Sequence, residues 1–181
     1  MTKHVAPQGY WLAGLWLLAV VGCAHSVRPP AAAIAVPALN GAMAKLSFYV
    51  GEWSCKGSEI EGDRVVAEYP LGVTVTPMLD GSWVSIIVVK DGVPTTAEFK
   101  GYSATDKRFH HVWAAGGGEW GSLSSEGWRD DEMMFVDDHP GATAERMVFH
   151  KDSDTHYTHR AESQDANGWH ATFRKVCDKR A

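Results

Sequence analysis

Histidines are the residues of this chain whose types and spacing come closest to those of a chemical site. His110 and His111 are adjacent, and His156 and His159 are three residues apart. Successive side chains of a strand point to opposite faces, so the members of each pair diverge and no metal site is expected. His159 does share a face with Tyr157, as an acid–base pair would. The chain contains neither G-x-S-x-G nor H-E-x-x-H, and the sequence does not support catalysis.

Tryptophans and two side chains near the C-terminus favour binding instead. Trp53 and Trp113 are two of eight tryptophans, and Trp113 lies in an alternating run over residues 107–114. His170 and Arg174 share one face of an extended segment, where they would hold an anionic group. We predict that these four side chains line a small-molecule site. The alternatives are that the tryptophans pack in the core and that Arg174 is a solvated cation.

Short β-rich runs separated by turn signals must position these residues. The signals recur at nearly regular spacing and imply about ten strands. Residues 39–50 carry apolar side chains at helical spacing and predict one short helix before the first strand. No second helix long enough for a parallel crossover is indicated, which predicts an all-β antiparallel barrel or sandwich. The signals are Glu61–Asp63, Asp80–Gly81, Asp91–Gly92, Ala104–Asp106, Gly116–Gly118, Arg129–Asp131, His139–Gly141, Asp152–Asp154 and Ala166–Gly168.

The N-terminal segment resembles the signal of a bacterial lipoprotein. Lys3 gives a weakly basic start, and the apolar run Tyr10–Val21 ends at Gly22–Cys23. The resemblance implies cleavage after Gly22 and acylation of Cys23. Ala24 follows instead of aspartate, which implies the outer membrane, facing the periplasm, in a cell that has one. The alternatives are an ordinary signal peptide cleaved near Ala24 and an uncleaved anchor.

The chain therefore divides into three predicted segments. Residues 1–22 are the lipoprotein signal peptide, residues 23–38 an Ala- and Pro-rich tether, and residues 39–181 one folded domain. The formal net charge of −5 gives no basic surplus, so nucleic acid is not expected as a partner. The membrane is expected as a partner through the lipid anchor.

The cysteines agree with export. With Cys23 assigned to the lipid, Cys55 and Cys177 remain as an even pair. In an oxidising periplasm that pair predicts a disulfide between the beginning and the end of the domain. The alternative is two separate buried thiols.

The opening of the domain carries a recognisable motif. Phe48–Trp53 reads FYVGEW and is followed by Gly57. This F-x-V-G-x-W-x-x-x-G pattern, the helix before it and the ending Gly168–Lys179 resemble the bacterial domain of unknown function 1579 family. The resemblance implies an antiparallel ten-stranded lipocalin-like (calycin) barrel with a short N-terminal helix. It also implies that Trp53 plugs the closed end of the barrel.

Lipocalin-like barrels pack a basic residue of the last strand over that tryptophan, and Arg174 is the expected residue here. The alternative is a solvated Arg174. If Trp53 and Arg174 point inward, Cys55 does too, but Cys177 is an odd number of residues from Arg174 and points outward. Unless a bulge or an early end of the last strand intervenes, either the disulfide or the Arg174 contact is wrong.

A second resemblance concerns a cofactor. Gly168–Lys175 is similar to the ending H-L-x-x-T-x-x-K of the nitrobindins, haem-binding ten-stranded barrels whose first histidine in this pattern ligates iron. Gly168 occupies the ligand position here, so haem is disfavoured and no cofactor is expected. His170, two residues further along the same face, is the alternative ligand.

The sequence thus predicts a lipid-anchored barrel that binds a small hydrophobic or amphipathic molecule in its mouth. One alternative is an envelope interaction module with a filled lumen and a partner-binding loop at Ala115–Glu119. An enzymatic barrel would need two titratable side chains that converge in the lumen.

Overall fold

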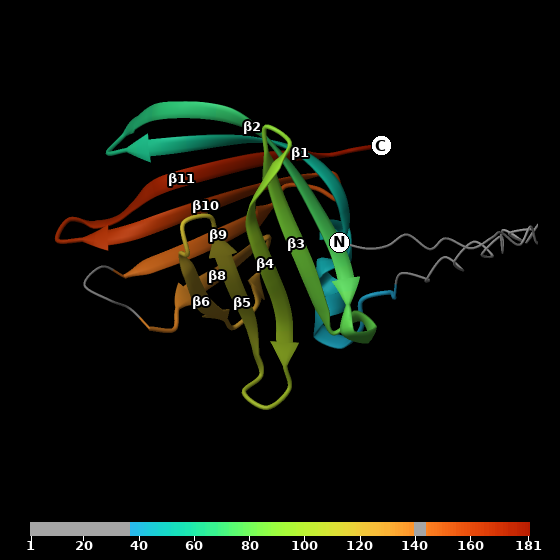
Figure 1. The fold of residues 1–181 in the computed structure, drawn as a ribbon. Coiled ribbons are helices and arrows are strands. Elements are labelled where there is room, and N and C mark those ends of the chain that lie inside the picture. The colour runs from blue at the N-terminus through green and yellow to red at the C-terminus, as the bar shows by residue number, and fades with distance from the viewer. Residues whose placement is uncertain (1–36, 140–143) are drawn as a thin grey trace, which may run out of the picture. The chain divides into compact units, whose positions relative to one another are not determined.

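The computed structural model describes residues 37–139 and 144–181 (Figure 1). The predicted signal peptide, Cys23 and nearly all of the predicted tether lie outside the described residues. None of the helices in the described ranges is long and apolar enough to cross a membrane.

A 3-10 helix precedes the sheet, where the sequence predicts its one short helix. This helix, η1 (Gly41–Tyr49), has buried Met43, Leu46 and Tyr49 on its inner side. Gly51 then adopts a φ of +125°, a conformation that favours glycine, and turns the chain into the first strand. A second, three-residue helix, η2 (Leu79–Gly81), lies between two strands.

The described residues form eleven strands in one antiparallel sheet. The sheet is closed because β6 also pairs with β8, while β1 pairs with β11. The strands are β1 (Gly51–Glu61), β2 (Arg64–Met78), β3 (Trp83–Lys90), β4 (Val93–Ser103), β5 (Arg108–Ala115), β6 (Trp120–Ser125), β7 (Trp128–Arg129), β8 (Glu132–Asp137), β9 (Glu145–Lys151), β10 (His156–Asp165) and β11 (Gly168–Lys179).

This architecture confirms the predicted antiparallel ten-stranded lipocalin-like barrel. Ten strands close the ring, and the two-residue β7 is an additional strand paired with β8 alone. The sequence pattern does not predict β7, since the break before it lies at Glu126–Gly127 and not at a recognised turn signal. Gly127 has a φ of +110°, which ends β6 there.

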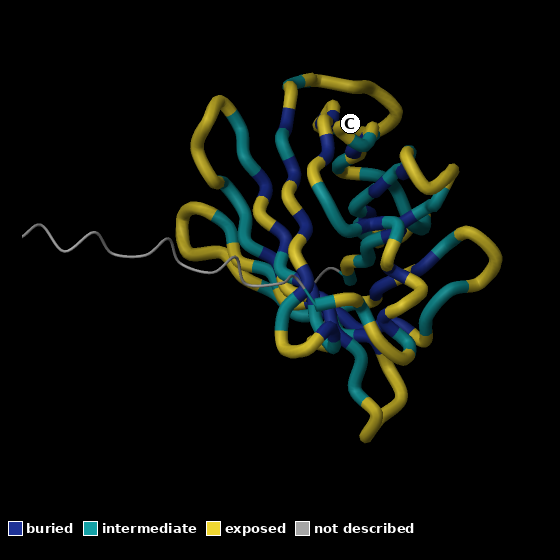
Figure 2. Tube along the Cα trace, turned by 90° about the vertical axis from the view of Figure 1, so that its right-hand side faces the viewer, coloured by how far each residue is buried: buried dark blue, intermediate teal, exposed yellow. Residues whose placement is uncertain are grey.

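Alternation along the strands builds the core. Phe109, His111 and Trp113 of β5 share one face, as the sequence pattern predicts. The structure shows that this face points inward, with Phe109 and His111 buried and Trp113 half-buried. Buried and exposed positions alternate in this way along much of the sheet, whereas the hairpin loops are exposed (Figure 2).

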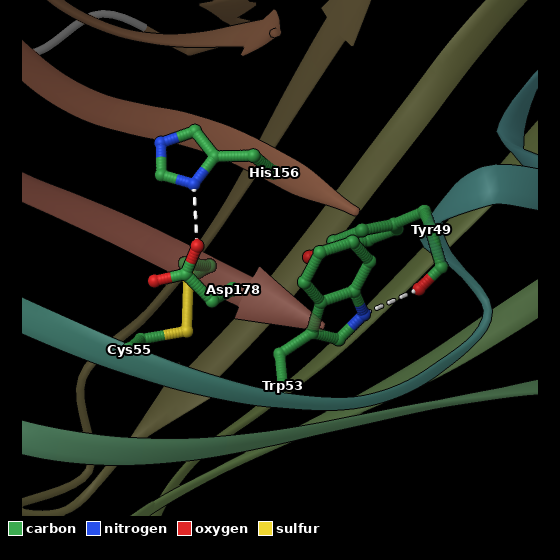
Figure 3. The surroundings of a disulfide bond; sticks show 6 residues. Tyr49, Trp53, Cys55, His156 and Asp178 are labelled. Carbon is green, nitrogen blue, oxygen red and sulfur yellow. Dashed lines mark hydrogen bonds and ion pairs between the residues drawn. A yellow bond between two sulfur atoms is a disulfide. The ribbon is translucent and has the colours of Figure 1, made fainter. Parts of the chain in front are cut away.

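The predicted disulfide between Cys55 and Cys177 is confirmed. The two residues are direct partners across β1 and β11, with Cα atoms 4.1 Å apart, and both are buried (Figure 3). They therefore tie together the strands nearest the two ends of the described domain. Because Cys177 points inward, Arg174 points outward, which settles the conflict of register.

Trp53 closes one end of the barrel, as expected. Its side chain is fully buried, and its Nε1 donates a hydrogen bond of 2.9 Å to the carbonyl oxygen of Tyr49 (Figure 3). The Tyr157 ring meets the Trp53 ring edge-on, with centroids 4.8 Å apart. Helix η1 thereby contributes Tyr49 to an aromatic plug, which we define as Tyr49, Trp53, Phe149 and Tyr157.

The expectation that Arg174 packs over Trp53 is wrong, because Lys179 does so. Lys179 is the direct partner of Trp53 across the β1–β11 pair, and its Nζ lies 5.3 Å from the Trp53 ring centroid. The same Nζ donates a hydrogen bond of 2.8 Å to the carbonyl oxygen of Phe48. Arg174 is exposed on the outer face.

Candidate ligand-binding site

A cavity of about 230 Å³ occupies the half of the lumen away from the aromatic plug. Its lining residues begin at the row of the disulfide, where Leu71 is the partner of Cys55, and continue toward the β3–β4 and β5–β6 hairpins. The apolar part of its wall is formed by Leu71, Val88, Trp113, Met147, Ala161 and Phe173. We call this space the upper cavity.

The Trp113 side chain can lie flat on the barrel wall because its partner on the neighbouring strand has no side chain. Its partner across β5 and β6 is Gly121. A Cβ atom at Gly121 would lie 2.8 Å from Trp113 Nε1, closer than carbon and nitrogen atoms pack. The indole therefore covers Gly121 and forms part of the cavity wall.

The floor of the upper cavity is polar. Glu98 of β4, His159 of β10 and Lys175 of β11 line it, and all three are buried. Lys100 and His111 lie deeper and are also buried. We call these five residues the polar floor.

Glu98 is the acceptor at the centre of the polar floor. Its Oε2 accepts hydrogen bonds from Lys100 Nζ at 3.1 Å and from His111 Nε2 at 2.9 Å. Burial opposes ionisation, but the Lys100 ammonium and the His111 hydrogen bond hold the pKa of Glu98 well below its ordinary value. Glu98 is therefore a carboxylate at neutral pH.

The two deeper bases are weakened by burial. Burial lowers the pKa of Lys100 to about 8, with Glu98 acting in the opposite direction. Burial, aided by the Lys100 charge, lowers the pKa of His111 to about 4. At neutral pH Lys100 is thus mainly an ammonium, and His111 is a neutral imidazole that donates Nε2–H to Glu98.

His159 has no polar partner in the part of the chain that the structure describes. Its two ring nitrogens are buried and make no hydrogen bond there. The ring stacks on Phe149, with centroids 4.4 Å apart and planes inclined by 16°. Burial and the charge of Lys175 lower the pKa of His159 well below its ordinary value, so the imidazole is neutral.

Lys175 is the second cation of the polar floor. It is the direct partner of His159 across β10 and β11. Burial lowers the pKa of Lys175, and the only opposing influence is the charge of Glu98. Among residues 37–139 and 144–181, no side chain forms a hydrogen bond or ion pair with its Nζ. Unlike Lys100, Lys175 has no bonded counterion there.

The four residues predicted to bind a ligand do not come together. Trp113 lines the upper cavity, whereas Trp53 lies in the plug beneath it. His170 is half-exposed, and its Nε2 lies 3.0 Å from Ser163 Oγ. Arg174 faces outward. Neither of these last two residues lines the cavity.

Glu98, Lys100 and Lys175 are lumen residues that the hydrophobic pattern of the sequence does not predict. On β4 the charged residues point inward and an apolar residue points outward, the reverse of the usual arrangement. Phe99 is 40% exposed, while Glu98 and Lys100 are buried. A signal was present for Lys175, since Phe173, Lys175 and Cys177 alternate on one face. Had Cys177 been placed inward through its disulfide with Cys55, the same alternation would have placed Lys175 inward.

The residues at the start of β11 do not fit the haem-iron ligation of the nitrobindin pattern. Gly168 supplies no ligating atom, and both ring nitrogens of His170 face protein partners, Ser163 and Asp165. In the described ranges no group of three or more His, Cys, Asp or Glu side chains is placed to hold a metal ion.

The fold and this cavity define a lipocalin-like β-barrel. No protein-family model matches the chain, and no curated protein matches it. Among solved structures, the chain is similar to the crystal structure of Rv2717c from M. tuberculosis, with a TM-score of 0.57. The similarity covers 79% of this chain and 99% of that chain at 15% sequence identity. A likeness at this identity establishes the fold.

Proposed function

We propose that this protein binds a small apolar or amphipathic molecule inside its barrel. The upper cavity is the observation that carries the proposal. It joins apolar walls to a few buried polar groups, and two of these, His159 and Lys175, have no bonded partner among the described residues. Cavities of this composition are typical small-molecule sites.

We further propose that the barrel is anchored to the cell envelope, on the outer membrane and facing the periplasm. The support is the lipoprotein-like signal that ends at Cys23. The disulfide agrees with an oxidising compartment. Membership of the domain of unknown function 1579 family is proposed on the F-x-V-G-x-W-x-x-x-G motif.

Fractionation of cells that produce the full chain tests the anchor. The wild-type protein is expected in the outer-membrane fraction with an acylated Cys23 at its N-terminus, as intact mass reports. The Cys23→Ser variant is expected to lose the acyl mass and the membrane attachment. An unacylated wild-type protein in the soluble periplasmic fraction would contradict the anchor.

Native mass spectrometry tests the ligand. The sample is the mature chain from residue 23 with Cys23→Ser, exported behind a cleavable signal peptide and purified without detergent; we call it the unacylated mature chain. A reproducible extra mass that disappears on denaturation is expected. A protein that is empty and takes up no added amphiphile would contradict ligand binding.

One observation favours a second function, that of an interaction module. Trp120, directly after the Gly116–Glu119 turn, is 74% exposed. A large exposed aromatic side chain beside a glycine-rich turn is typical of a contact surface. If the barrel proves empty, Trp120→Ser would be expected to abolish co-purification of an envelope partner.

A further inference from the structure

The polar floor carries a surplus of positive charge at neutral pH. Lys100 is mainly an ammonium, Glu98 is anionic, and the two histidines are neutral. Lys175 is a second amine, ordinarily an ammonium, whose pKa burial lowers and the charge of Glu98 raises. Glu98 already accepts bonds from Lys100 and His111 through one oxygen. Lys175 therefore remains a buried cation without a bonded counterion among the described residues.

Such an arrangement is costly in an empty barrel. A buried ammonium without a hydrogen-bonded anion pays a desolvation cost that a partner of opposite charge offsets. Lys100, the other lysine of the polar floor, has a further stabilising contact, because its Nζ lies 4.2 Å from the centroid of the Phe149 ring. Lys175 has no comparable contact in the described structure and lines the upper cavity.

His159 supplies a second donor beside Lys175. The two residues are directly opposed across β10 and β11, a placement that brings side chains on one face into contact distance. His159 is 4% exposed, and stacking on Phe149 fixes its ring plane. A neutral imidazole carries one N–H, and neither ring nitrogen of His159 has a partner among the described residues, so His159 is a candidate second donor beside Lys175.

The rest of the cavity is suited to an apolar body. Trp113, Met147 and Phe173 line the wall above the polar floor. The volume of about 230 Å³ suits one short chain or ring rather than a large lipid.

We infer that the upper cavity takes a small amphipathic monocarboxylate, with its carboxylate on Lys175 and His159 and its apolar part against Trp113 and Phe173. This inference rests on the proposed ligand-binding function. One negative charge matches the surplus of one cation on the polar floor, while Glu98 on the same floor repels a second negative charge. Lys90, the other lysine that lines the cavity, lies over the Tyr69 ring with its Nζ 3.6 Å from the ring centroid. Charge-assisted hydrogen bonds give the head group its selectivity.

A series of ligands with one chain and three head groups tests the inference. Octanoate, octanamide and octylammonium are titrated into the unacylated mature chain by calorimetry at pH 7. Octanoate is expected to bind at least tenfold more tightly than octanamide, and octylammonium more weakly than either. This comparison uses no substitution in the barrel, so it does not depend on the folding of a variant.

Substitutions then locate the head group. Lys175→Met is expected to reduce octanoate affinity to the level of octanamide and to leave octanamide affinity unchanged. His159→Phe, which keeps the stacked ring, is expected to weaken octanoate several-fold. The matched control is Arg174→Met, which removes one positive charge from the preceding residue of β11, on the outer face, and is expected to change neither affinity.

The outcomes separate this inference from the proposed function. Equal binding of octanoate and octanamide, or equal effects of Lys175→Met and Arg174→Met, would overturn the carboxylate assignment and leave a ligand-binding barrel. A neutral molecule found in the purified protein, with no uptake of octanoate, would do the same. Absence of any bound mass together with no binding of the three probes would overturn both.

Discussion

The two halves of the barrel lumen use the same strand alternation for opposite purposes. At the η1 end the aromatic plug and its neighbours leave a space of only about 10 Å³. Toward the hairpins the lumen opens into the upper cavity of about 230 Å³. Between them lie the disulfide and the Glu98–Lys100–His111 cluster.

The difference shows how a small barrel combines stability with a binding site. The filled half packs rings edge to face and donates the Trp53 N–H to a backbone carbonyl. The open half keeps both ring nitrogens of His159 buried without a bonded partner in the described structure, and burial lowers the pKa of Lys175; both effects cost stability. Sites of binding are commonly the destabilised part of a fold, and a rigid remainder compensates for them.

Truncation of the plug tryptophan is expected to destabilise the fold more than any other proposed substitution. Trp53→Ala deletes a fully buried indole and its hydrogen bond, and it is expected to lower the free energy of unfolding by about 3–5 kcal/mol. Trp113→Ala, in the open half, is expected to cost clearly less, because Trp113 is only half-buried and already borders a cavity. Urea unfolding of both variants measures the difference. Equal losses would mean that the two halves do not differ as described.

Removal of the disulfide is expected to have the next largest effect. The double variant Cys55→Ala, Cys177→Ala lacks a cross-link that joins residues separated by 122 positions in the sequence. The expected loss in the free energy of unfolding is about 2–5 kcal/mol. Reduction of the wild-type protein should reproduce the shift, and a reductant should have no effect on the double variant. If reductant did not change the unfolding midpoint of the wild-type protein, a stabilising disulfide between Cys55 and Cys177 would be contradicted.

Acidification is expected to weaken the barrel through the polar floor. His111 has a pKa of about 4 when folded and 6.5 as an ordinary histidine, so the unfolded chain binds more protons between these values. Stability therefore falls as the pH drops from about 6.5 to about 4, by up to about 3 kcal/mol from this residue. Glu98, whose pKa is lowered, adds a further loss below 4.5. His159, also lowered, acts in the same direction as His111.

Urea unfolding at a series of pH values checks this slope. His111→Gln is expected to flatten the fall between pH 6.5 and 4, whatever its effect on stability at pH 7. The matched control is His110→Gln, the adjacent histidine on the outer face, which pairs with Asp106 and is expected to keep the wild-type slope. A wild-type slope in His111→Gln would contradict the neutral buried histidine.

Loss of the cation over the plug is expected to destabilise the fold only slightly. Lys179→Met removes the contact with the Trp53 ring and the bond to Phe48. It is expected to lower the free energy of unfolding by about 0.5–2 kcal/mol. Arg174→Met, the residue that the family resemblance points to, is expected to change it by less than about 0.5 kcal/mol. The reverse order of effects would restore Arg174 as the partner of Trp53.

The features that the sequence predicted correctly depend on the alternation of side chains along strands and on the spacing of turn residues. Regular turn signals gave the strand number nearly correctly, and alternation placed Phe109, His111 and Trp113 on one face. The even cysteine pair predicted the disulfide that ties β1 to β11. Trp53 was expected at the closed end, and it lies there.

Alternation alone does not say which face is inside. A period of two residues places Glu98 and Lys100 on one face of β4 and Phe99 on the other. Hydrophobicity would put Phe99 inside the barrel, but the structure buries Glu98 and Lys100 and exposes Phe99. The same parity excludes Arg174 once Cys177 points inward, and it selects Lys179, which lies an even number of residues from Cys177. Buried charges are the positions where hydrophobic pattern fails, and here they form the floor of the candidate site.

The most direct test of the division into a filled and an open half is an NMR titration of the unacylated mature chain with octanoate, observed at the tryptophan indole N–H signals. We expect the Trp113 signal to shift in a saturable manner, and we expect the signal of Trp53, whose indole N–H is bonded to Tyr49 in the plug, to stay unchanged. A saturable shift of the Trp53 signal with none at Trp113, or no saturable shift at either indole, would contradict a ligand site in the upper cavity.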